Sequence, residues 1–149
     1  MRSRFLPEGR LLHTPENEAA CASRDGLRRA MEEETVLEGV AQLCDGAHNL
    51  LVSVGPFTGF LPREEAALGI AEGTTREIAI LSRVGKPVCF QITALEESEG
   101  VLRPRLSRRR AQQAALDAML AGLHPGCILP AVVTHLESFG AFVDIGCGV

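Results

Sequence analysis

The sequence predicts a mainly β fold, and two stretches support this prediction most directly. Residues 36–44 and 49–54 are apolar runs typical of strands, and the dipeptide Asp45-Gly46 between them is a strong short-range turn signal. Near the end of the chain, residues 141–145 alternate between two sets of side chains as a strand requires. Each stretch therefore predicts a strand, and the first predicts a hairpin.

Two phenylalanines mark the second stretch. The apolar residues of one parity in 141–145 predict a core face, which leaves Phe142 pointing outward. Phe139 has the inward parity, but Gly140 follows it, and a glycine in a strand pattern often marks a bulge that can reverse a side chain. Two interpretations stay open: both rings form an exposed surface on which bases can stack, or both are core residues.

The residues around these phenylalanines carry a family resemblance. The segment VVTHLESFGAFVDIG resembles the opening strands of the RNA-binding OB-fold repeat of the small-subunit (30S) ribosomal protein S1 family. A divergent copy of the same repeat is similar to the upstream segments VLEGVAQLCDGAHNLLVSVGPFTGFLPREEAAL, VGKPVCFQITALE and LRPRLSRRRAQ. The resemblance implies a five-stranded closed barrel for each repeat, with RNA bound on the face of strands two and three.

This resemblance divides the chain into four parts. Residues 1–34 are expected to be an N-terminal extension with a short helix, and residues 35–110 the first, divergent OB repeat. Residues 111–125 are expected to be a linker helix, and residues 126–149 the incomplete start of a second repeat. The predicted fold class is thus one five-stranded barrel with flanking short helices, plus the beginning of another.

Bulk composition excludes several classes of protein. The five cysteines are scattered, with no C-x-x-C pair, which argues against a disulfide framework and a zinc site and predicts reduced cytosolic thiols. No apolar stretch approaches 18 residues, and no signal peptide is recognisable, so no export signal or membrane span is expected. The net charge of −4 argues against a general polyanion binder. Lys86 is the single lysine, so the positive charge is almost all arginine.

The N-terminal extension contains one predicted helix. Residues 1–22 are rich in turn signals and are expected to be irregular. Ser23 is a good N-cap residue, and apolar residues then recur at helical spacing up to the acidic run 32–34. That run falls at the C-terminal end of the helix, where the helix dipole disfavours anions, so it marks a junction and not a metal site.

The first repeat departs from its family where RNA would be contacted. Alignment of the two repeats places His48 and Leu51 where the second repeat has Phe139 and Phe142. His48 can stack on a base, although a histidine beside a turn is more often only solvated. Where family repeats carry a histidine after a glycine and two apolar residues, this chain has Pro62.

The remaining elements of the first repeat follow from local signals. Pro62 predicts the first position of a short helix. Residues 76–81 and 86–95 are predicted to supply the remaining strands, and Cys89 is expected to be a buried thiol.

The strongest charged feature is a run of five arginines within residues 103–110. In a repeat of this family the run would end the last barrel strand and lead into the linker helix, with Ser107 as its cap and an apolar stripe at residues 116, 119, 120 and 123. Arginine runs are usually solvated surface, but at the end of a strand beside a binding face they can contact phosphates. The predicted RNA-binding residues are therefore Phe139, Phe142, His48, Lys86, Arg105, Arg108, Arg109 and Arg110.

No catalytic motif, cofactor loop or metal-ligand pattern is recognisable in the sequence. We therefore expect a cytoplasmic, non-enzymatic protein without a cofactor or small-molecule substrate. The resemblance implies binding of single-stranded RNA or mRNA in translation at the small ribosomal subunit. Two alternatives remain: an accessory RNA-binding module of a larger enzyme such as an exoribonuclease, or a module that docks on the ribosome or on a protein and has no RNA affinity of its own.

Overall fold

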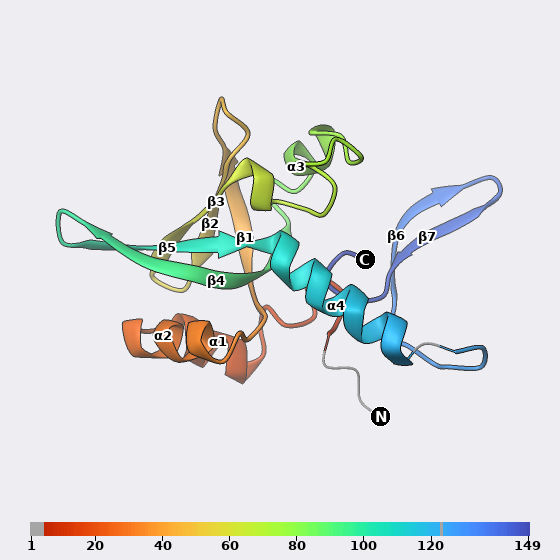
Figure 1. Cartoon of the computed structure of the whole chain (residues 1–149), viewed down its shortest axis with the longest axis horizontal. Helices are drawn as coiled ribbons and strands as arrows, with labels where there is room; N and C mark the ends of the chain where they lie inside the picture. The colour runs from red at the N-terminus through yellow and green to blue at the C-terminus, as the bar shows by residue number, and fades with distance from the viewer. Residues whose placement is uncertain (1–4, 123) are drawn as a thin grey trace.

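Five strands close into a barrel in the order β1-β2-β3-β5-β4 (Figure 1). The computed structural model describes residues 5–122 and 124–149. The strands are β1 (Leu37–Cys44), β2 (Leu50–Val54), β3 (Phe57–Leu61), β4 (Pro87–Ser98) and β5 (Val101–Ser107). All neighbours are antiparallel except β3 and β5, which close the barrel in parallel. This architecture confirms the predicted five-stranded, OB-like fold class.

Side-chain alternation fills the barrel. On β2, Leu50, Val52 and Val54 are fully buried, whereas the residues between them are only half-buried. They pack in the interior with Phe90 and Leu106. Irregular register in β1 and in β4 bends these strands, as barrel closure requires.

Two N-terminal helices lie against the barrel beside β1 and β4 (Figure 1). Helix α1 spans Pro15–Cys21 and α2 spans Arg24–Glu32. Ser23 caps α2 by accepting a hydrogen bond from the backbone N–H of Gly26, as predicted. The expectation that residues 1–22 are irregular is wrong for α1, because Thr14 caps this helix and Pro15 occupies its first turn.

The segment between β3 and β4 contains two short helical pieces among turns and bends. A 3-10 turn, η1 (Arg63–Glu65), follows Pro62, and α3 (Ile78–Leu81) occupies part of the region predicted to be a strand. That strand prediction is wrong, since the barrel closes without it. Of the four residues of α3 only Ile80 is buried.

Helix α4 (Arg108–Gly122) continues directly from β5. Ser107 accepts a hydrogen bond from the backbone N–H of Arg110 at 3.0 Å, which confirms its predicted capping role. The buried face of α4 consists of small and polar residues near its start, including Ala111 and Ala115. The predicted apolar stripe is buried only in part: Met119 is half-buried and packs against a cluster of buried residues that includes Cys89 of β4, whereas Leu120 is 72% exposed and Leu123 lies outside the described residues.

The last two strands form a separate hairpin of β6 (Val132–Glu137) and β7 (Gly140–Asp144), which projects beyond α4 (Figure 1). After β7 the chain returns to the barrel, where the backbone N–H of Cys147 donates to the carbonyl of Leu6 at 3.0 Å. A hairpin is therefore present in residues 126–149; their assignment as a second repeat stays a prediction. Within the described residues, no helix has the length and apolar character that a membrane span needs.

Candidate nucleic-acid interface

One row of outward side chains crosses four strands of the barrel. The strand registers pair Leu43 with Leu51, Leu51 with Phe60, and Phe60 with Arg105. Leu43 and Arg105 are exposed at the two ends, and Leu51 and Phe60 are half-buried between them. These four residues form what we call the barrel row.

The aromatic ring in this row is covered by a cation. The guanidinium carbon of Arg105 lies 5.5 Å from the ring centroid of Phe60, within the range of a cation–π interaction. The same guanidinium is 3.7 Å from the carboxylate of Glu96 on β4. Arg105, predicted as an RNA contact, therefore lies on the outer face of the barrel with both an aromatic and an acidic neighbour.

The β6–β7 hairpin carries three neighbouring rings. Phe139 and Phe142 meet edge to face with centroids 6.2 Å apart, and His135 lies 5.9 Å from Phe142. Phe139 is 81% exposed and Phe142 is 53% exposed. We call these three residues the ring cluster. Of the two interpretations of the phenylalanines, the structure has the exposed pair. Because the hairpin projects beyond α4, the ring cluster and the barrel row are separate surfaces (Figure 1).

The structure places His48 in an ion-pair cluster. His48 is in the turn between β1 and β2 with a φ of 65°, and its Nδ1 contacts a carboxylate oxygen of Glu77. The other oxygen of Glu77 accepts a 2.5 Å hydrogen bond from Nε of Arg63. These hydrogen bonds, from Arg63 first and then from His48, lower the pKa of Glu77 below its ordinary value.

The other predicted cations at the end of the barrel are spread out. Lys86 is exposed in the turn before β4, and Arg110 is exposed in the first turn of α4. Arg109 makes two hydrogen bonds to Glu65, of 3.1 and 3.2 Å. Burial raises the pKa of Glu65, but the hydrogen bonds from Arg109 and Ser107 outweigh it and the pKa is lowered.

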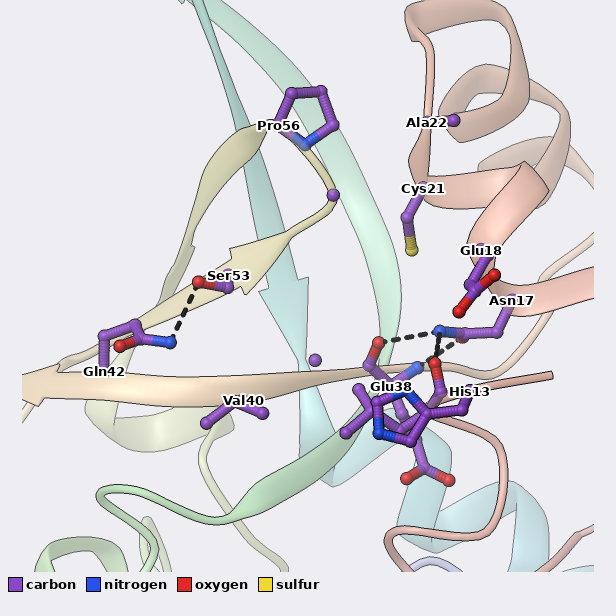
Figure 2. A pocket seen from close by; sticks show the side chains of 13 residues that line it. His13, Asn17, Glu18, Cys21, Ala22, Glu38, Val40, Gln42, Ser53 and Pro56 are labelled. Atoms are coloured by element: carbon purple, nitrogen blue, oxygen red, sulfur yellow. Dashed lines mark hydrogen bonds between the residues drawn. The ribbon is translucent and has the colours of Figure 1, made fainter. Parts of the chain in front are cut away.

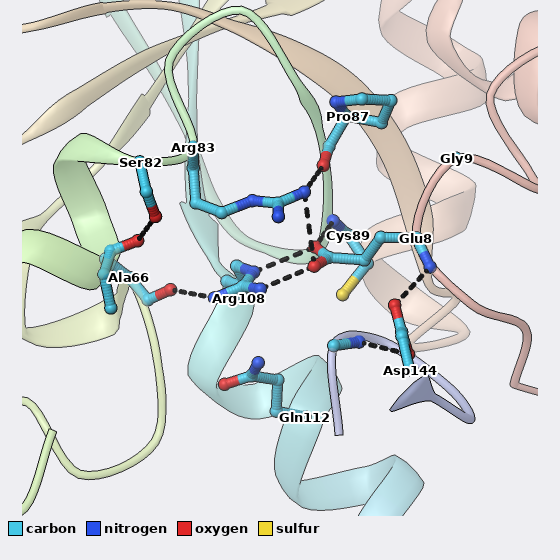
Figure 3. Close-up of polar contacts among 12 residues, drawn as sticks. Glu8, Gly9, Ala66, Ser82, Arg83, Pro87, Cys89, Arg108, Gln112 and Asp144 are labelled. Carbon is cyan, nitrogen blue, oxygen red and sulfur yellow. Dashed lines mark hydrogen bonds and ion pairs between the residues drawn. The ribbon is translucent and has the colours of Figure 1, made fainter. Parts of the chain in front are cut away.

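Arg108 corrects the sequence interpretation (Figure 3). Its guanidinium is buried and binds both carboxylate oxygens of Glu8, with Nε at 2.9 Å and Nη2 at 2.5 Å, and Nη1 donates to the carbonyl of Ala66. Burial opposes the charge of Glu8, but the hydrogen bonds and charge of Arg108 outweigh burial and hold the Glu8 pKa below its ordinary value. Arg108 thus holds the N-terminal segment on the barrel and presents no surface to a phosphate.

The same network fixes the C-terminal segment. The backbone N–H of Glu8 donates to Asp144 at 2.8 Å, and Asp144 also accepts hydrogen bonds from the N–H groups of Gly146 and Gly148 (Figure 3). Cys89 lies beside this network, buried as predicted, and burial raises its pKa. Glu8 therefore connects both ends of the described chain to β4 and α4.

A cavity of about 400 Å³ lies between α1 and the barrel (Figure 2). Asn17 on its wall bonds both the backbone N–H and the carbonyl of Glu38, at 2.8 and 3.1 Å. The carboxylate of Glu38 accepts hydrogen bonds from Gly9 and Leu11, and burial raises its pKa. Burial also raises the pKa of Cys21 to about 11, so this thiol stays protonated at neutral pH. The polar groups of this cavity join α1 to β1.

Among the residues that the structure describes, no cluster of three or more His, Cys, Asp or Glu side chains could hold a metal ion. Two participants in the candidate surfaces carried no clear sequence signal. Phe60 is one aromatic residue in an apolar strand, and only the pairing of β2, β3 and β5 shows that it faces outward beside Arg105. Glu77 reaches His48 only because the segment between β3 and β4 folds back over the β1–β2 turn.

In the comparisons with known proteins, the chain matches solved structures only. No family model matches the chain, and no curated protein matches it. GSP13 from Bacillus subtilis is similar over 65% of this chain and 64% of its own, with 19% identity and a TM-score of 0.39. A chain of the a/eIF2alpha–aDim2p–rRNA complex from Pyrococcus horikoshii is similar over 59% of this chain and 50% of its own, with 16% identity and a TM-score of 0.42. The matched region thus spans less than two thirds of either known chain. At these identities and TM-scores, neither similarity indicates a function for this chain.

Proposed function

We propose that this protein binds single-stranded RNA through the ring cluster and the barrel row. In this proposal it acts in the cytoplasm without catalysing a reaction, on mRNA at the small ribosomal subunit during translation. The resemblance of its two segments to the repeats of the ribosomal protein S1 family supports the finer part of this proposal.

The ring cluster is the observation that carries the proposal. Large aromatic side chains are usually buried, yet Phe139 and Phe142 are both exposed and lie in contact with each other. Bases of any sequence can stack on such rings, and each stacked base contributes about 1–3 kcal/mol by alanine substitution. Two adjacent rings suit a strand whose bases are unpaired.

The barrel row supplies a second surface for RNA, and part of the positive charge near it is neutralised by carboxylates. Phe60 and Leu51 offer an apolar strip for a base or a sugar, and Arg105 can contact a phosphate beside it. The neighbouring arginines are partly neutralised by Glu96 and Glu65. With Arg108 buried, Arg105, Arg109 and Arg110 remain for phosphates, so we expect about three phosphate contacts and a slope of log affinity against log salt of about −2, at roughly −0.7 for each contact.

Direct binding to RNA oligonucleotides tests the proposal. Phe142→Ala should weaken binding about five-fold or more by fluorescence anisotropy, with little change in melting temperature, because the ring is exposed. Leu136→Ala is the matched control, since Leu136 is a 73% exposed aliphatic residue on the same hairpin. Leu51→Ala should weaken binding less than Phe142→Ala, because an aliphatic side chain offers apolar contact but no π-face on which a base can stack.

Two results would contradict this function. If wild-type protein fails to bind RNA at low salt, the proposal is wrong. If Leu136→Ala costs as much affinity as Phe142→Ala, the hairpin binds through general apolar contact and not through stacking.

Docking on a protein is the second candidate, because each of three arginines near the barrel face is paired with a carboxylate: Arg63 with Glu77, Arg105 with Glu96, and Arg109 with Glu65. An apolar strip with a polar, charge-paired rim is also the anatomy of a protein interface. Co-sedimentation with small ribosomal subunits, with and without nuclease treatment of their exposed RNA, separates the two candidates. If the protein still co-sediments after nuclease treatment and does not bind free RNA oligonucleotides, docking on protein is favoured.

A further inference from the structure

The Glu77 carboxylate bridges two groups that belong to other elements. One oxygen contacts the guanidinium of Arg63, which follows β3, and the other contacts Nδ1 of His48 in the β1–β2 turn. All three side chains are between about a third and two fifths exposed, so the cluster lies at the surface. The two oxygens of this carboxylate are thus held between a histidine and an arginine.

The two groups that hold this anion are positioned without Glu77. Asp45 accepts hydrogen bonds from the backbone N–H groups of Ala47 and Asn49, both at 2.9 Å, and so fixes the turn that carries His48. The side-chain oxygen of Asn49 then accepts a hydrogen bond from the backbone N–H of Arg63 at 2.8 Å. The backbones that carry His48 and Arg63 are therefore joined to each other by hydrogen bonds that do not involve Glu77.

The segment that supplies the carboxylate is more loosely attached. Glu77 immediately precedes α3, a four-residue helix that packs Ile80 into the core but leaves Ile78 64% exposed and Leu81 41% exposed. Few buried apolar contacts are typical of segments that open at low free-energy cost. The Glu77 side chain is itself 38% exposed, so it can rotate out of the site while Ile80 stays in the core and the turn and the barrel stay folded.

The cluster of Glu77, Arg63 and His48 also lies where an RNA strand bound on the barrel row would continue. Leu50 pairs with Leu61 and Leu51 pairs with Phe60, so the β2–β3 ladder ends beside Asn49 and Arg63. An RNA strand stacked on Phe60 could extend along these strands and bring a phosphate next to His48 and Arg63.

We propose that Arg63 and His48 form a binding site for a phosphodiester group, that the Glu77 carboxylate occupies this site in the free protein, and that RNA displaces it. The inference rests on the proposed RNA binding and deepens it. Glu77 acts as an internal competitor: each binding event must first release its two contacts, which lowers affinity. A phosphodiester matches the site because its two unesterified oxygens can replace the two carboxylate oxygens.

Glu77→Gln tests this inference, because glutamine keeps the size of the side chain but loses its charge. Affinity for a single-stranded oligouridylate at low salt should rise about three-fold or more. Arg63→Gln combined with Glu77→Gln should remove the gain. The control is Glu64→Gln, which removes a carboxylate 3.7 Å from the same arginine that does not bridge to His48, and it should change affinity less than Glu77→Gln.

The outcomes separate the inference from the function beneath it. If the wild type binds and Glu77→Gln, with an unchanged melting temperature, binds no more tightly, the inference is wrong and RNA binding stands. If neither protein binds, both are wrong. A second readout is the His48 ring signal in NMR spectra of the wild type: replacement of the Glu77 carboxylate by a phosphodiester should change this signal when RNA is added, and an unchanged signal in the RNA-bound protein would overturn the displacement.

Discussion

Arginines that look alike in the sequence have different surroundings in the fold. Arg105 is exposed over Phe60, Arg109 is half-buried against Glu65, and Arg108 is buried against Glu8. In the sequence, strand parity distinguishes Arg105 and the start of a helix distinguishes Arg109. The partner of Arg108, however, lies 100 residues away in the chain. No local sequence pattern indicates so distant a partner. All of these arginines were therefore predicted to form one phosphate-binding group.

The buried pair makes Arg108 a stability residue. Arg108→Ala leaves the Glu8 carboxylate buried without its cation, and such a loss typically costs about 3–5 kcal/mol in the free energy of unfolding. Urea denaturation measures this cost. Arg110→Ala, on the exposed side of the same helix turn, should change stability by about 0.5 kcal/mol or less. A loss below about 1 kcal/mol for Arg108→Ala would mean that water reaches Glu8.

Acid should weaken the same pair. The folded-state pKa of Glu8 is lowered from 4.5, so its contribution to stability is complete above that pH and is lost as the pH falls through the lowered value. Glu8→Gln should reduce stability at pH 7 and flatten its decline in acid, as followed by urea denaturation between pH 7 and pH 3. Glu38 works in the opposite direction, since its raised pKa gives a contribution that is lost as pH rises. An unchanged acid slope in Glu8→Gln would assign acid sensitivity to other carboxyl groups.

At the level of elements, sequence patterns identified strands better than short helices. The Asp-Gly turn predicted the β1–β2 hairpin, and the alternation in 141–145 predicted a strand that the structure contains as β7. Helix α3 was predicted as a strand, because periodicity cannot separate a strand from a helix in so short an apolar run. Helix α1 was missed because its cap and first turn, Thr14 and Pro15, also read as turn chemistry.

The contact of α1 with the barrel depends on a glycine. Gly55, between β2 and β3, has a φ of +55°, and a Cβ there would lie 2.2 Å from the carbonyl oxygen of Cys21. Gly100 shares the left-handed conformation, with a φ of +78°, but has open space around it. Gly100→Ala should therefore cost about 1 kcal/mol of unfolding free energy from backbone strain alone. Gly55→Ala should cost more than twice as much in thermal or urea denaturation, because α1 must also move; equal costs would show that the helix adjusts freely.

The β6–β7 hairpin should be the least protected pair of strands. Nearly all of its residues are exposed on both faces, and isolated two-stranded hairpins are marginal in water. Amide hydrogen exchange should therefore be fast in residues 132–144 and slow in the barrel strands, whose interior side chains are buried. Equal protection of hairpin and barrel would show that the hairpin is as stable as the barrel.

At the level of the whole molecule, the closed barrel followed from the resemblance, whereas the surfaces on it did not. Residue types indicated aromatic and cationic contacts, but they left open whether Phe139 and Phe142 form an exposed pair or core residues, and only the structure has them exposed. The barrel row depends on the registers of four strands, and the anion site depends on three segments that meet only in the folded chain. Such surfaces result from long-range pairing, for which the local sequence carries no signal.

The Glu8 network is also expected to form late in folding, after the strands of the barrel have paired. Its bonds join residue 8 to residues 108 and 144, at sequence separations of 100 and 136, whereas the β2–β3 ladder joins neighbouring strands. Distant segments close late in folding because the entropy of loop closure precedes any contact energy. Arg108→Ala should therefore leave the refolding rate nearly unchanged and accelerate unfolding about a hundredfold or more in stopped-flow experiments. The ion pair would then act as a latch on an already formed barrel, and its strength would set how long each molecule stays folded.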